Sequence, residues 1–153
     1  MSVDPSIVAL ETLLARKRRA DAVLLSMDGY DRWGRDQDTA ESRARMDTEM
    51  TRATAEREAA TTGLRAEIAR LRAERPEAID RWIDLHVGLL RAFLEANPEP
   101  QAGSHAATAA HVARQEIEAW RAVGRGERAL VDENVYYLQP DPARYREAFG
   151  IDP

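Results

Sequence analysis

The chain has 153 residues, a formal net charge of -5 and a pI of about 5.3, and hydrophobic residues make up 44% of it. The negative charge argues against nucleic-acid binding, because phosphate contacts need accumulated cationic side chains. The absence of cysteine excludes disulfides, thiol nucleophiles and thiolate metal sites, and fits a reducing compartment. No secretory segment and no apolar run near ~20 residues occurs, so we expect a cytoplasmic protein without membrane insertion.

The composition favours helices. Alanine, glutamate and arginine are abundant, and charged residues make up 32% of the chain. We therefore expect an all-α fold in which a long antiparallel helical hairpin, residues 1–75, joins a compact helical C-terminal region, residues 76–153. This length is enough for one domain with a sizeable core, or for a small bundle with an extended hairpin.

The first helix is expected at about residues 5–28. Asp4 can cap free backbone amides and Pro5 is tolerated at the first helical position, while Asp28 and Gly29 suit a helix end. Residues 16–19 form the only basic run. Four consecutive helical residues point around most of the circumference, so this run is interpreted mainly as a solvated face.

The turn after this helix contains two large aromatic residues, Tyr30 and Trp33, between glycines. Packing at the end of a helical hairpin is the leading interpretation. The same side chains also suit an exposed anchor for a partner protein, because each combines an apolar body with a polar tip.

The second helix is expected at about residues 38–75, started by Asp38 or Thr39 and stopped before Pro76. Two threonines and Gly63 weaken the helix, but apolar residues keep helical spacing on both sides, so we predict that it is continuous. Its apolar positions form a narrow stripe suited to a coiled-coil-like contact. They are Met46, Met50, Ala53, Ala60, Leu64, Ile68 and Leu71.

In the C-terminal region, apolar spacing and helix-end residues predict further helices. A broadly apolar core helix begins at Pro76 and ends near Asn97, and another covers residues 105–123. Residues 127–138 fit a helix better than a lone strand, although the composition of residues 135–138 resembles a strand. A short last helix begins at Pro142, ends at Gly150 and places two aromatic rings on one face, Tyr145 and Phe149.

The candidate chemical groups are few. His86 falls on the apolar face of the core helix, where a buried, hydrogen-bonded histidine is the leading interpretation and a base or ligand the alternative. His111 lacks a metal-binding partner at a recognised spacing, and Asp80 and Asp84 are expected to face solvent. No phosphate loop, nucleophile elbow or dinucleotide fingerprint occurs. We therefore expect no enzyme, cofactor or metal site.

The sequence favours a non-enzymatic protein–protein interaction module, an adaptor or scaffold that binds another protein, itself as a homodimer, or both. An acidic immunity protein or antitoxin covering a basic target is the alternative, and a helical bundle binding a metal or small ligand is the third. Glutamate at Leu64 and Leu71 is predicted to break self-association. The candidate interaction residues are Tyr30, Trp33, Met46, Met50, Leu64, Ile68 and Leu71.

Overall fold

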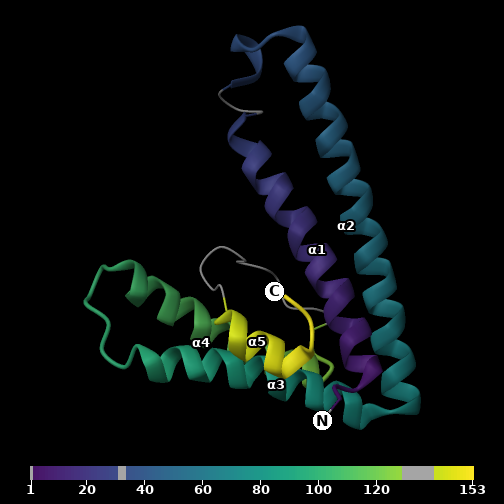
Figure 1. Ribbon diagram of the computed structural model, residues 1–153, viewed down its shortest axis with the longest axis vertical. Coiled ribbons are helices and arrows are strands. Elements are labelled where there is room, and N and C mark those ends of the chain that lie inside the picture. Colours follow the sequence, from purple (N-terminus) through teal and green to yellow (C-terminus); the bar gives the residue numbers. More distant parts are fainter. Residues whose placement is uncertain (1, 31–33, 129–139) are drawn as a thin grey trace. The chain divides into compact units, whose positions relative to one another are not determined.

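The computed structural model describes residues 2–30, 34–128 and 140–153. These residues form helices and connecting turns without a strand, which confirms the all-α class. The α-helices are α1 (Pro5–Gly29), α2 (Ala40–Glu74), α3 (Pro76–Ala96), α4 (His105–Gly124) and α5 (Pro142–Phe149), and a 3-10 turn, η2 (Arg35–Gln37), precedes α2 (Figure 1). Within the described residues, no helix has the length and apolar character that crossing a bilayer requires.

The chain folds into two compact units. One contains residues 1–11 and 65–153, and we call it the terminal unit. The other contains residues 12–64, and we call it the hairpin unit. The division expected from the sequence, residues 1–75 and 76–153, stays a prediction about domains.

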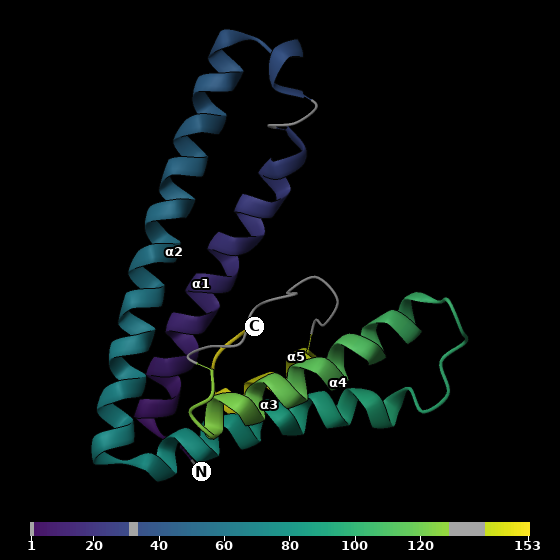
Figure 2. The ribbon, with the colours of Figure 1, turned by 180° about the vertical axis from the view of Figure 1, so that it is seen from behind.

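The hairpin unit consists of the later part of α1 and the first part of α2, which run antiparallel side by side in both views (Figures 1 and 2). As predicted, α2 continues through Gly63. A Cβ atom at Gly63 would lie 3.2 Å from the Cδ2 atom of Leu13, so glycine lets the two helices approach closely here.

The helix ends follow the capping residues that the sequence predicts. The Asp4 carboxylate accepts a hydrogen bond from the Ser6 amide at 2.9 Å, and the Thr39 hydroxyl accepts one from the Ser42 amide at 3.1 Å. Pro76 opens α3 directly after α2, and Gly150 ends α5 with a φ of 70°. Local chemistry therefore fixes where these helices begin and end.

The terminal unit packs α4 and α5 against α3 (Figure 1). One broad face of α3 is buried, whereas Asp80, Asp84 and Gly88 on its other side are exposed. As predicted, Tyr145 and Phe149 lie on one face of α5, and both are buried. Most of the segment whose helix or strand character was left open, residues 127–138, lies outside the described residues.

Candidate functional site

A buried carboxylate, Glu11, lies at the centre of the terminal unit and is only 1% exposed. Its Oε2 atom accepts a hydrogen bond from Nε1 of Trp82 at 3.0 Å and lies 2.7 Å from Nε2 of His86. Its Oε1 atom accepts a hydrogen bond from the Tyr145 hydroxyl at 2.6 Å. Side chains from α1, α3 and α5 therefore meet at one carboxylate. We call these four residues the carboxylate cluster.

Aromatic rings enclose the carboxylate cluster. The ring of His86 stacks on Trp120, with centroids 4.1 Å apart and planes 7° apart, and lies 4.8 Å from the ring of Phe149. The indoles of Trp82 and Trp120 meet edge to face at 4.9 Å. Nε1 of Trp120 is buried without a hydrogen-bond partner among the described residues.

The carboxylate cluster contains the residue types of general acid–base chemistry, but its side chains are buried. His86 is 5% exposed, and Trp82 is not exposed at all. A general base must come within hydrogen-bond reach of its substrate. The burial of these side chains keeps a substrate out of that reach. The predicted buried, hydrogen-bonded histidine is confirmed.

Sequence reasoning missed Glu11. The signal was its position, because Ile7, Leu10, Glu11 and Leu14 follow the spacing of one buried helix face. A charged residue inside an apolar stripe indicates a buried and satisfied charge.

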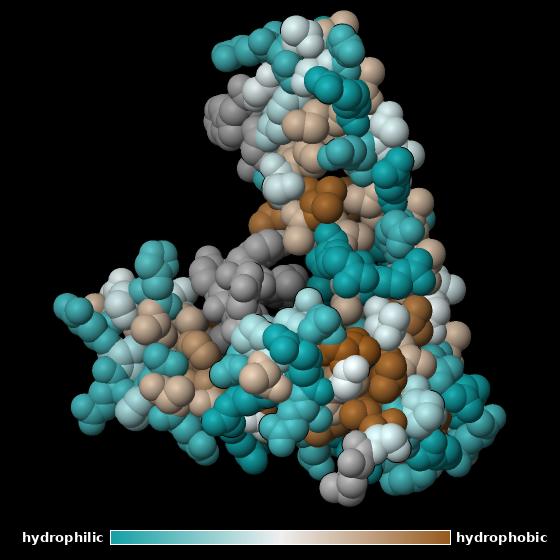
Figure 3. All heavy atoms as spheres, viewed as in Figure 1, coloured by the Kyte–Doolittle hydropathy of each residue, from teal (hydrophilic) through white to brown (hydrophobic). Residues whose placement is uncertain are grey.

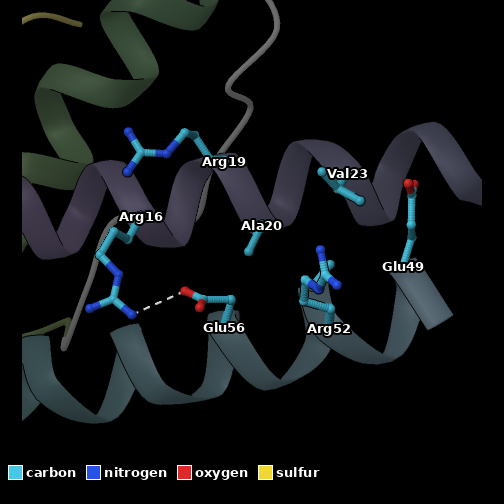
Figure 4. A pocket seen from close by; sticks show the side chains of 8 residues that line it. Arg16, Arg19, Ala20, Val23, Glu49, Arg52 and Glu56 are labelled. Carbon is cyan, nitrogen blue, oxygen red and sulfur yellow. Dashed lines mark hydrogen bonds and ion pairs between the residues drawn. The ribbon is translucent and has the colours of Figure 1, made fainter.

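The hairpin unit has an open surface groove of about 510 Å³ between α1 and α2 (Figure 4). Ala20 and Ala53 form its floor because their short side chains leave space between the helices. Val23 lines one side, and charged residues form the rim: Arg16, Arg19, Glu49, Arg52 and Glu56. The space-filling view shows hydrophobic and hydrophilic residues intermixed along the hairpin (Figure 3).

The basic run of α1 is less solvated than the sequence predicts. Arg16 pairs with Glu56 at 3.0 Å, and Lys17 pairs with Asp21 at 3.0 Å. Arg18 is half-buried, whereas Arg19 is exposed. Only part of the run is therefore a solvated face.

The predicted interaction residues lie in different environments. Tyr30 is half-buried, and its hydroxyl donates a hydrogen bond to Asp38 at 2.9 Å. Burial of the phenol, and then its hydrogen bond to this carboxylate, raise the pKa of Tyr30. Met46 and Met50 are half-buried, so part of each side chain is accessible. Trp33 lies outside the described residues.

The other three predicted interaction residues are buried in the chain. Leu64 and Leu71 have no exposed surface, and Ile68 is 4% exposed. The expectation of an exposed contact stripe at these positions needs correction, because their side chains already stabilise the protein's own core.

The polar residues weighed as metal ligands lie mainly at the surface. His111, Asp80 and Asp84 are exposed, as expected for the two aspartates. Among the described residues, no group of three or more histidine, aspartate or glutamate side chains is arranged to hold a metal ion. Comparisons with protein-family models, curated proteins and solved structures give no match.

Proposed function

We propose that this chain is a non-enzymatic helical protein–protein interaction module, an adaptor or scaffold, whose hairpin unit supplies the binding surface. The groove between α1 and α2 carries the proposal. It has an apolar floor and a rim of both charge signs, which is the arrangement of a protein interface with a polar rim.

The hairpin unit exposes two large apolar side chains, of which Val23 lines the groove. Val23 is 36% exposed and Leu25 is 51% exposed, the large hydrophobic residues with the most exposure in the described part of the chain. Single exposed apolar residues are ordinary on protein surfaces. Beside the groove, Val23 supplies apolar area that a partner helix can cover. Leu25 follows two residues later and therefore points to the other side of α1.

The carboxylate cluster supports a structural role over a catalytic one. Three neighbouring side chains satisfy Glu11, and all of them are buried. A buried polar network with its hydrogen bonds formed favours one specific packing of the helices around it. The absence of cysteine fits a reducing compartment, and we propose that the protein works in the cytoplasm.

Affinity capture with the tagged full chain tests this function. Val23→Glu places a charge on the proposed surface, whereas Leu25→Glu and Ala55→Glu place the same charge at exposed sites of the hairpin unit away from the groove. We expect a protein, including an untagged copy of this chain, that wild type, Leu25→Glu and Ala55→Glu retain and Val23→Glu loses. Equal retention by all four chains, or by none, contradicts the proposal.

The acidic immunity protein or antitoxin is a second candidate, favoured by where the charge lies. Residues 12–64 contain ten basic and ten acidic residues, so the net charge of -5 belongs entirely to the terminal unit. A basic target would bind exposed acids such as Asp80 and Asp84. Capture of one cationic protein, lost when both become asparagine and kept in Val23→Glu, favours this candidate.

A further inference from the structure

The exposed surface of α2 carries a row of four charges with alternating sign. Arg45, Glu49, Arg52 and Glu56 follow one another at steps of four, three and four residues, the spacing that keeps side chains on one helix face. All four are exposed. Glu56 pairs with Arg16, whereas the other three form no ion pair within the described residues. We call these four residues the charge row.

The charge row is complementary to itself when two copies run antiparallel. A two-fold axis midway between positions 49 and 52 places Glu49 of the first copy opposite Arg52 of the second copy. It also places Arg52 of the first copy opposite Glu49 of the second. The same register sets Arg45 against Glu56. Every charge of the row then faces its opposite, whereas a parallel arrangement in register would set each charge against its own kind. Closed two-fold symmetry requires a surface that is complementary to itself in this way.

The surroundings of the charge row fit the same symmetry. Val23 of α1 lies level with the stretch of α2 between Arg52 and Glu49 (Figure 4), so the axis brings Val23 close to its counterpart. Its exposed apolar surface would be covered near the centre of the contact. The equal numbers of basic and acidic residues in the hairpin unit also remove the net repulsion that two like-charged surfaces would have.

We infer that a second copy of this chain docks antiparallel along the charge row, so that α2 lies against α2 and the groove of each hairpin unit is covered. This inference rests on the proposed function, because it names the partner of the same surface. The register is specific: position 49 faces position 52, and position 45 faces position 56.

Charge reversal at two positions tests the register in the full chain. Glu49→Arg and Arg52→Glu each replace two opposite-charge contacts of the dimer by two like-charge contacts. We expect each variant alone to dimerise roughly 10- to 100-fold more weakly than wild type in sedimentation equilibrium. Added salt should also weaken the wild-type dimer, because it screens the attraction between the exposed charges of the two rows.

Two recombinations of these variants restore complementarity. In an equimolar mixture, the arginines at 49 and 52 of one variant face the glutamates at 52 and 49 of the other, so a heterodimer should form. The double variant Glu49→Arg with Arg52→Glu exchanges both signs and should dimerise with an affinity near that of wild type. A merely unfolded variant would recover in neither case.

The same helix offers matched controls. Glu58→Arg and Arg65→Glu make the same charge changes at exposed positions outside the charge row, and should leave the dimer unchanged. A monomeric wild type, or a mixture that fails to recover, overturns the inference. If the chain proves monomeric but still captures a different protein in a way that Val23→Glu abolishes, the proposed function holds and only the inference of a homodimer fails. A chain that stays monomeric and captures nothing overturns both.

Discussion

Glu11 and His86 are 75 positions apart in the chain, yet Oε2 of Glu11 lies 2.7 Å from Nε2 of His86 in the core of the terminal unit. The same carboxylate accepts hydrogen bonds from Trp82 and Tyr145. One side chain of α1 is therefore bonded to both α3 and α5.

Glu11→Ala should strongly destabilise the protein. It leaves the buried Trp82 and Tyr145 donors without their acceptor, and each unsatisfied buried group costs about 1–3 kcal/mol. We expect a loss of about 2–5 kcal/mol in the free energy of unfolding, measured by urea denaturation. The exposed Glu58→Ala is the control and should change it by less than about 0.5 kcal/mol. If the two variants lost equal free energy of unfolding, the hydrogen bonds of Glu11 would not stabilise the protein as described.

Asp4 links stability to pH. Hydrogen bonds from the Arg75 side chain, at 2.6 Å, and from the Ser6 amide hold the pKa of Asp4 below its usual value of 3.8. A depressed folded-state pKa contributes stability above the unfolded pKa, and this contribution is lost as pH falls through the folded pKa. Asp4→Asn should therefore lower the urea midpoint at pH 7.

The difference between the urea midpoints of wild type and Asp4→Asn should shrink as the pH falls below about 4. Asp80→Asn, at an exposed position of α3, provides the matched control, with a midpoint close to that of wild type at both pH values. A difference between Asp4→Asn and wild type that stays constant down to acid pH would rule out linkage to this carboxylate.

Replacing two of the glycines by alanine should change the stability of the protein in opposite directions. Gly88 is exposed within α3, and a Cβ there would meet nothing within 4 Å, so Gly88→Ala should stabilise the protein by about 0.5–1 kcal/mol. Gly150 has a φ of 70° and a Cβ there would lie 3.3 Å from Cγ2 of Val3, so Gly150→Ala should destabilise it by about 1–2 kcal/mol. Thermal unfolding monitored by circular dichroism should give melting shifts of opposite sign.

Leu64→Glu with Leu71→Glu should unfold the protein instead of only separating its copies. Both leucines are fully buried, and losing each costs about 2–5 kcal/mol before the burial of a carboxylate is added. Together these costs approach the total stability of a typical domain, about 5–15 kcal/mol. Loss of helical circular dichroism is the expected result. A folded monomer would instead restore these leucines as contact residues, as the sequence predicted.

Sequence reasoning succeeded where local chemistry decides the structure. Thr39, Pro76 and Gly150 mark helix ends through their own hydrogen bonds or backbone preferences, so their roles can be identified without knowledge of the fold. The apolar spacing around Gly63 likewise predicts a continuous helix, since the pattern keeps its phase across the glycine.

The carboxylate cluster could not be predicted in the same way. Glu11 becomes a core residue only because donors from α3 and α5 reach it, and no local pattern identifies partners so distant in the chain. The burial of Leu64 and Leu71 has a similar origin. Spacing indicates that they share a helix face, but not whether the same chain or another copy covers that face.

The bond between Glu11 and Tyr145 joins residues 134 positions apart, which has a consequence for synthesis. A ribosome releases residues 12–64 long before Tyr145, so the hairpin unit can assemble from neighbouring helices while translation continues. Until then the Glu11 carboxylate stays hydrated, because Tyr145, which donates a hydrogen bond to it in the folded protein, has not yet been synthesised. The terminal unit can complete its core only after α5 has been synthesised.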